Sequence, residues 1–373
     1  MKEIEQVSIV GVGLIGGSLG LVFRQHGIRV VGFDKDAESL KRAAALGVID
    51  EGIPQLVKAV SDSDVIIVCT PVRTIRAILE QLSAISLKPG AIVTDTGSTK
   101  KELADFAKRL RWQNGSYIGA HPMAGSHRSG VEAATSDLFE NAYYVLTPSK
   151  ETPLSTVEKL TKLLKFTRAK IVQMTADEHD RIMAAISHWP HVLAAMLVNQ
   201  VGEYNKRNGW YHTLAAGGFR DFTRIASSDP KMWRDITLTN RVPILTMLEH
   251  WQRELSQFRH MLLNEQEEDL EAFFLGAKRF RDQLPKRARG SLPRVYECYV
   301  DVPDHPGSIG KVATLLGNKG ISLANIGILE NREEVAGVLR LAFYKEADYD
   351  RAVSVLKEHG YPVYPAEREN GNR

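Results

Sequence analysis

The sequence predicts three successive domains: a doubly wound α/β domain over residues 1–175, an all-α domain over 176–289 and a small α+β domain over 290–373. Three observations predict this order. Short β-branched runs first alternate with helix-like stretches, apolar residues then recur at helical spacing, and a second group of strand-like runs follows a basic linker. A length of 373 residues is typical of two or three domains.

The first domain contains strand-like runs separated by helix-like segments. The runs are continuously apolar rather than alternating, as expected for a mostly parallel sheet that helices cover on both faces. We predict strands over 7–10, 29–33, 65–70, 91–94, 117–120, 143–147 and 170–173.

The second domain begins near Asp177, where the strand signals disappear and apolar residues recur three or four positions apart. We expect helices whose core includes Trp189, Met196 and Leu197. Six basic residues between positions 278 and 289 then precede a Gly- and Pro-containing stretch. We interpret this segment as a helix end and a solvated linker, with polyanion binding as the alternative.

The third domain opens with a strand over 295–301, in which apolar and polar residues alternate. Prolines and a glycine then lead into a helix near 309–316. Two strand-like runs, a second helix over 348–359 and a strand at Val363 complete the order βαββαβ. This order predicts a ferredoxin-like α+β fold.

The composition excludes several classes of protein. A formal net charge of +3, with no basic concentration before residue 278, argues against a nucleic-acid partner. The two cysteines, Cys69 and Cys298, form no CxxC pair, so we expect neither a disulfide framework nor a zinc site. We find no secretion signal or membrane-spanning stretch and therefore expect a cytoplasmic protein without a membrane partner.

The first strand runs directly into the sequence GVGLIG, which is the GxGxxG fingerprint of a Rossmann-like dinucleotide-binding domain. Gly11 would allow the tight turn, and Gly13 would let the backbone approach a pyrophosphate at the positive end of a helix. Gly16 would let that helix lie close to the strand. Asp34 stands at the tip of the second strand, where a carboxylate binds the adenosine ribose. It would repel a 2′-phosphate, so we expect NAD rather than NADP, although Lys35 could approach such a phosphate.

Polar motifs follow two strands at their carboxyl ends, where doubly wound sheets bind their substrates. They are DTGSTK at 95–100 and HPMAGS at 121–126. Together with SHWPH at 187–191 and GGFRDFTRIASSDPKMW at 217–233, they resemble the prephenate dehydrogenase family over essentially the whole chain. The segment DVPDHPGSIGKVATLL at 301–316 is similar to the start of an ACT regulatory domain.

The resemblance implies oxidative decarboxylation of prephenate to 4-hydroxyphenylpyruvate with NAD, on the route to tyrosine. It further implies that the helical domain binds substrate and forms a homodimer. Such a reaction needs a nicotinamide over the carbon that loses hydride, an acceptor for the hydroxyl proton and cations for two carboxylates.

His121 is the proton acceptor that we expect, because a neutral imidazole can take a hydrogen bond from the substrate hydroxyl. The family assigns to the serine that matches Ser98 a bridging role between histidine, substrate and nicotinamide. Without the motif, a histidine at a strand end is more often structural than catalytic.

Arg224 is the expected anchor of the ring carboxylate, and an ion pair with Asp221 could hold it in place. The resemblance places Ser187 and His191 at the substrate, and their spacing of four residues puts both on one side of a helix. Trp233 matches a tryptophan that lines the same pocket. A solvated, salt-bridged arginine face is the blander interpretation.

The ACT-like segment implies feedback by L-tyrosine at an interface between two such domains. Asp304, His305 and Gly307 form the turn before a helix N-terminus, and Asn325 offers a side-chain amide nearby. The alternative is a domain that only packs against another copy.

Several alternatives remain open at this point. Arogenate, which carries an amine in place of the ketone, is a close rival substrate, and a non-catalytic sensor of NAD and tyrosine is a rival of another class. Some relatives carry glutamate where this chain has His127, so no gating role is transferred to that residue. We expect no metal, because His188 and His191 have no third ligand near them in sequence.

Overall fold

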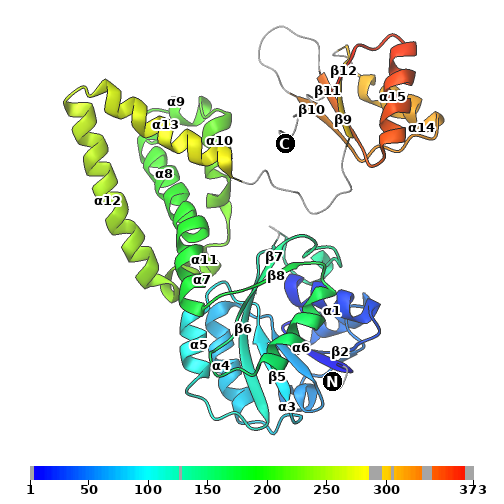
Figure 1. Cartoon of the computed structure of the whole chain (residues 1–373), viewed down its shortest axis with the longest axis vertical. Coiled ribbons are helices and arrows are strands. Elements are labelled where there is room, and N and C mark those ends of the chain that lie inside the picture. The colour runs from blue at the N-terminus through cyan, green and yellow to red at the C-terminus, as the bar shows by residue number, and fades with distance from the viewer. Residues whose placement is uncertain (1–3, 126–127, 285–295, 304–305, 330–337, 366–373) are drawn as a thin grey trace. The chain divides into compact units, whose positions relative to one another are not determined.

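The structure is a computed structural model that describes residues 4–125, 128–284, 296–303, 306–329 and 338–365. The chain divides into two units, Met1–Pro285 and Lys286–Arg373. Figure 1 labels most of the helices and strands of the two units.

The first unit is built on a sheet of eight strands in the order β3-β2-β1-β4-β5-β6-β7-β8. Every neighbouring pair is parallel except β6 and β7, which are antiparallel. The strands are β1 Gln6–Val10, β2 Arg29–Phe33, β3 Glu51–Gly52, β4 Val65–Val68, β5 Ala91–Asp95, β6 Gly115–Pro122, β7 Tyr143–Thr147 and β8 Lys170–Gln173. All seven predicted strands are present, and only the two-residue β3 was missed, because so short a strand has no hydrophobic pattern.

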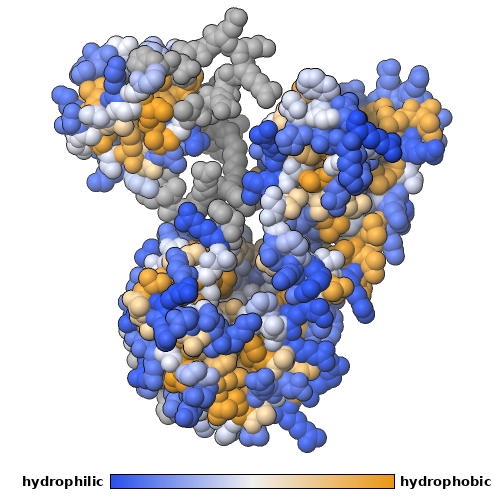
Figure 2. All heavy atoms as spheres, turned by 180° about the vertical axis from the view of Figure 1, so that it is seen from behind, coloured by the Kyte–Doolittle hydropathy of each residue, from blue (hydrophilic) through white to orange (hydrophobic). Residues whose placement is uncertain are grey.

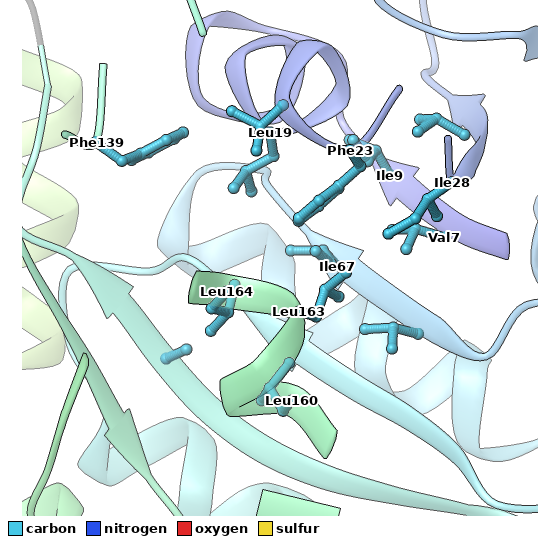
Figure 3. Packing of buried hydrophobic residues seen from close by; sticks show 14 of the residues in the cluster. Val7, Ile9, Leu19, Phe23, Ile28, Ile67, Phe139, Leu160, Leu163 and Leu164 are labelled. Atoms are coloured by element: carbon cyan, nitrogen blue, oxygen red, sulfur yellow. The ribbon is translucent and has the colours of Figure 1, made fainter. Parts of the chain in front are cut away.

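Helices cover both faces of this sheet, since successive strand residues point to opposite sides. Ile9 and Ile67 pack with α1 (Leu14–Gln25) and α6 (Leu154–Lys165) on one face, as Figure 3 shows. Their neighbours Val10 and Val68 pack with helices on the other face. The helices of that second face are α3 Leu56–Val60, α4 Val72–Ser83 and α5 Lys101–Ala107, whereas α2 Ala37–Ala45 belongs with α1. The predicted α/β fold class is therefore confirmed.

The parallel direction of β1, β4, β5 and β6 brings their carboxyl ends to one edge of the sheet. This edge carries the glycine turn after β1, the loop 96–100 after β5 and His121 at the end of β6. Three motifs that lie far apart in sequence are thus placed along one edge.

Helices make up the rest of the first unit (Figure 1). They are α7 Ala176–Met183, η2 Ala184–His188, α8 Trp189–Asn205, α9 Trp210–Thr213, α10 Gly217–Thr223, η3 Arg224–Ser227, α11 Pro230–Thr239, α12 Arg241–Leu263 and α13 Glu267–Gln283. The segment η2 is a π-helical turn that ends two residues before Pro190, which lies in the first turn of α8. Because proline donates no backbone hydrogen bond, the wider turn lets the helical path continue past it.

The helical part buries few apolar side chains within one copy of the chain. Trp189 lies in a small cluster with Ala184 and Ile244, as predicted for Trp189. The prediction for Met196 was wrong, because that side chain is 54% exposed, and Leu197 is only half-buried. Figure 2 shows apolar surface along these helices. A large exposed apolar surface of this kind is typical of a protein–protein contact, which explains why helical spacing alone misplaced Met196.

One helical stretch, Ala176–Asn205, is long and apolar enough to cross a membrane, judged by length and composition only. This is weak evidence, since core helices of globular domains pass the same test. The stretch supplies Ala184 and Trp189 to the buried cluster, and 28% of its most apolar window is buried in one copy of the chain.

The second unit has the order βαββαβ, with β9 Tyr296–Asp301, α14 Ser308–Asn318, β10 Asn325–Leu329, β11 Val338–Phe343, α15 Glu346–Glu358 and β12 Val363–Pro365. Its sheet order is β10-β11-β9-β12, and each neighbouring pair is antiparallel. Val312 and Leu316 of α14 pack with Ala352 and Leu356 of α15 in one core with the sheet. The predicted ferredoxin-like fold is confirmed.

The close contact between α1 and the sheet generates a testable prediction. A Cβ added at Gly16 would lie 2.1 Å from the carbonyl oxygen of Gly11 and 2.8 Å from Ile9 Cγ2, so backbone must shift to accept it. We expect Gly16→Ala to lower the free energy of unfolding by roughly 1–3 kcal/mol in a denaturant titration.

The matched control is Gly13→Ala, because a Cβ at Gly13 would meet nothing within 4 Å. Its free energy of unfolding should change by less than about 1 kcal/mol. Equal stability of the two variants would contradict the packing role of Gly16.

Candidate active site

The glycine turn and Asp34 form the dinucleotide end of the site. Gly11 has φ +99°, a backbone conformation that favours glycine, and its N–H donates to the carbonyl of Phe33 on β2. Asp34 receives hydrogen bonds from the N–H of Val12 at Oδ2 and of Asp36 at Oδ1, each 3.0 Å long. Each carboxylate oxygen keeps a second lone pair, so Asp34 is fixed beside the turn and still able to accept bonds from a ribose.

The residues of this turn fit a dinucleotide. Gly13 precedes the first turn of α1, and no side chain caps the N–H groups there. The space in front of Gly13 is open, since an added Cβ would touch nothing within 4 Å. A pyrophosphate can therefore approach the backbone at the positive end of α1. Gly11, Gly13 and Asp34 would hold NAD here, and Gly16 would position the helix.

His121 lies at the end of β6 with part of its surface accessible. Its Nδ1 shares a hydrogen bond of 2.9 Å with Nε2 of His179. The pKa of His121 is held well below its ordinary value of 6.5, first by burial and then by His179, Lys100 and His188 around it. The imidazole is thus neutral at physiological pH, as a proton acceptor must be.

His179 and Asp180, on α7, were missed by sequence reasoning. His179 is fully buried, and its Nδ1 lies 2.8 Å from Oδ1 of Asp180. Asp180 accepts hydrogen bonds of 2.8 Å from the backbone N–H groups of Lys100 and Lys101 at the start of α5. A His-Asp pair in a polar first helical turn has no pattern of its own, and only the packing of α7 against α5 and β7 shows its importance.

A buried ion pair holds the loop that contains Ser98. Lys100 donates to the carboxylate of Asp95 and, over 2.7 Å, to the carbonyl of Ala120, the residue before His121. Tyr117 donates to the other oxygen of Asp95 over 2.6 Å. Burial lowers the pKa of Lys100, which Asp95 opposes, and burial raises the pKa of Tyr117. Because these bonds join the ends of β5 and β6, the half-buried Ser98 stays on the same edge as His121.

Four of the predicted substrate residues gather in the helical part. The ring of His191 stacks on Trp233, with centroids 3.6 Å apart and planes at 23°. Burial lowers the pKa of His191, its bond to Ser187 opposes this, and the charge of Arg224 lowers the pKa further. Nδ1 of His191 donates to the carbonyl of Ser187 over 2.9 Å, so its Nε2 is left as an acceptor.

His188 lies between the His191–Trp233 pair and His121, since it contacts the first and acts electrostatically on the second. It is buried, its ring meets Trp233 edge to face at 6.1 Å, and it contributes to the lowered pKa of His121. Asn240 donates to Nδ1 of His188 over 2.9 Å and lies 2.9 Å from the carbonyl of Asp180. Burial lowers the pKa of His188 to about 4, so this ring is also neutral. The sheet edge and the helical part therefore meet along one continuous polar junction.

Some predicted features are not formed or not described. No ion pair joins Arg224 to Asp221 in the described part of the chain, and both side chains are exposed, where such a pair gains little. His127, Asp304 and His305 lie outside the described residues.

The arrangement suits removal of hydride from an alcohol that also carries a carboxylate. A neutral imidazole can accept the hydroxyl proton, the arginine whose charge acts on His191 can bind an anion, and the glycine turn can hold the hydride acceptor.

Comparison with known proteins agrees with this chemistry. The profile of the prephenate dehydrogenase nucleotide-binding domain matches residues 19–173, and that of the prephenate dehydrogenase dimerization domain matches residues 175–275. The chain is 42% identical over 355 residues to a prephenate dehydrogenase of Bacillus subtilis (strain 168), covering 95% of this chain and 96% of that relative.

Two solved structures are similar over the first unit. A prephenate dehydrogenase from A. aeolicus, in complex with hydroxyphenyl propionate and NAD+, has a TM-score of 0.71 and 32% identity, covering 76% of this chain and 99% of that one. An arogenate dehydrogenase from Synechocystis has a TM-score of 0.68 and 30% identity, covering 75% and 100%. With matches of this extent in both sequence and structure, the chain belongs to the prephenate dehydrogenase family.

Proposed function

We propose that this chain catalyses the NAD-dependent oxidative decarboxylation of prephenate to 4-hydroxyphenylpyruvate, a step in the biosynthesis of tyrosine. The observation that carries the proposal is the neutral, partly accessible imidazole of His121 on the same sheet edge as the dinucleotide turn. Incubation of the protein with prephenate and NAD, with NADH formation followed by absorbance, tests it directly.

The substrate itself supplies the driving force, because loss of CO2 makes its ring aromatic. NAD, when bound, supplies the acceptor of the hydride. His121 accepts the hydroxyl proton, and its lowered pKa keeps the ring in the unprotonated form that this task requires. Ser98, on the loop fixed by Lys100, orients the hydroxyl.

The helical part binds the carboxylates of the substrate. Arg224 anchors the ring carboxylate, because the planar guanidinium group of arginine binds a carboxylate through two parallel hydrogen bonds. Nε2 of His191, Ser187 and the face of Trp233 complete the proposed pocket. The functional boundaries that we propose are 1–175 for the cofactor, 176–289 for substrate and dimer contacts and 290–373 for regulation.

Arogenate is the second candidate substrate, since one similar structure is an arogenate dehydrogenase. The two substrates differ by an amine in place of a ketone. If kcat/KM is higher for arogenate than for prephenate, arogenate is the substrate and the proposal of prephenate is wrong.

The chain works as a dimer through its helical part, which matches the dimerization domain and exposes much apolar surface. A reducing cytoplasm is the location that we propose, because both free cysteines are at least partly buried and unpaired.

L-tyrosine is the regulator that we propose for the second unit. Gly307 has φ +91° directly before α14, whose first turn has no side-chain cap. The N–H groups of this turn suit an amino-acid carboxylate, and Asn325 at the start of β10 is exposed and suits the amine.

The first prediction concerns the proton acceptor. We expect His121→Asn to lower kcat by roughly 10²-fold or more with a modest change in KM, because asparagine cannot take up the proton. Steady-state kinetics with prephenate measure this. His26→Asn is the control and should match the parent in kcat, because the ring of this exposed histidine bonds the carbonyl of Val22 and stacks on Phe166, away from the site. An unchanged kcat in His121→Asn would show that His121 is not the proton acceptor.

The second prediction concerns the anion anchor. We expect Arg224→Ala to raise KM for prephenate by roughly 10²-fold, the value of a lost charge-assisted bond of about 3 kcal/mol, with a smaller effect on kcat. Arg224→Lys should recover only part of the loss, since lysine cannot bind bidentately. The exposed Arg207→Ala serves as the control. A large fall in kcat at constant KM would argue against an anchoring role.

The third prediction concerns regulation. Equilibrium dialysis of the full chain should show L-tyrosine binding, and Asn325→Ala should weaken it roughly tenfold, as expected for one lost hydrogen bond. Asn318→Ala, at the other end of α14, is the control. Absence of tyrosine binding to the parent protein would leave the second unit without this role.

A further inference from the structure

A row of three hydrogen-bonded side chains begins at His121 and leads away from the accessible part of the site. Nδ1 of His121 bonds Nε2 of His179, and Nδ1 of His179 bonds Oδ1 of Asp180, over 2.9 and 2.8 Å. His179 is fully buried and Asp180 is 2% exposed, so both side chains are removed from water. Neither side chain is on the sheet edge itself, since both belong to α7.

Asp180 determines which nitrogen of each ring carries a proton. The backbone N–H groups of Lys100 and Lys101 point at its two oxygens, so the carboxylate acts as an acceptor. The adjoining Nδ1 of His179 is then the donor, and with a single proton on that ring its Nε2 is left as an acceptor. Nδ1 of His121 must in turn donate to that nitrogen, and the unprotonated atom of His121 is Nε2.

We propose that His179 and Asp180 are positioning residues that hold His121 in the Nδ1–H tautomer and stabilise the cation that forms when Nε2 takes the substrate proton. The proposal rests on the proposed function, since it assigns a task to the base of that reaction. In the step itself one O–H bond of the substrate breaks and one N–H bond forms at Nε2. The Nδ1–H of His121 stays hydrogen-bonded to His179 throughout.

The other groups that face His121 cannot perform this task. Lys100 donates to Asp95 and to the carbonyl of Ala120, and its charge disfavours a cation on His121. Nδ1 of His188 is already bonded to Asn240. Among the residues that the structure describes, Asp180 is the carboxylate connected to His121 through hydrogen bonds, and its negative charge offsets the nearby lysine where the dielectric constant is low.

Two substitutions of His179 separate positioning from simple packing. The side chain of His179→Gln can accept from Nδ1 of His121 and donate to Asp180, whereas His179→Phe can do neither. We expect His179→Phe to lower kcat by roughly 10²-fold or more at nearly constant KM, and His179→Gln to remain within roughly tenfold of the parent. His26→Gln is the control, because that exposed ring has no bond to this row. Thermal unfolding of each variant establishes that it is folded.

The tautomer can also be measured directly in the parent protein. Full-length protein labelled with [15N]histidine should show His121 protonated at Nδ1 and not at Nε2, with its signals identified by their loss in His121→Asn. Protonation at Nε2 would overturn the proposal, as would equal kcat values for His179→Phe and His179→Gln. The spectrum involves no substrate, so an error in the proposed reaction would appear instead as a parent protein that forms no NADH from prephenate.

Discussion

The rest of this site depends on one constraint, which is that the largely buried imidazole of His121 stays neutral. Burial at the end of β6 makes a charge on His121 costly, and the ammonium group of Lys100 nearby adds to that cost. The cost of burying the charge of Lys100 is offset because its ammonium group donates to Asp95 and to the carbonyl of Ala120. Tyr117 donates to the other oxygen of Asp95. The same bonds join the ends of β5 and β6. Lys100 and its partners therefore both help to keep His121 neutral and hold the two strand ends together.

The junction between the sheet and the helices has a second consequence. Asp180 of α7 accepts the first N–H groups of α5, and Thr99 bonds Thr239 of α11 over 3.0 Å. The helical part is therefore fixed to the edge where the cofactor turn lies, rather than attached by a free linker. This attachment supports the proposal that His191 and Arg224, 70 and 103 residues after His121, contribute to the same site.

Much of this architecture was predictable from sequence, for identifiable reasons. Continuous apolar runs marked seven strands, and a glycine fingerprint between strand and helix marked the cofactor turn, because both are local patterns. The roles of His179 and Asp180 were not predictable, since they arise only where α7 packs on α5. Met196 was misplaced for a related reason: helical spacing identifies an apolar face but not whether its partner is the same chain. The predicted ion pair of Arg224 with Asp221 is not formed. Both side chains are exposed to water, where such a pair gains too little free energy for closeness in sequence to bring them together.

The pH dependence of kcat/KM tests the neutral imidazole most directly, because it reports the free enzyme. A group whose pKa is depressed stays unprotonated until the pH falls below that pKa, so kcat/KM should show no protonation of His121 near its ordinary value of 6.5 and should decline only well below it. The substrate carboxylates and the stability of the protein must be measured over the same range. A fall in kcat/KM centred at or above pH 6.5 that is absent from His121→Asn would contradict the account.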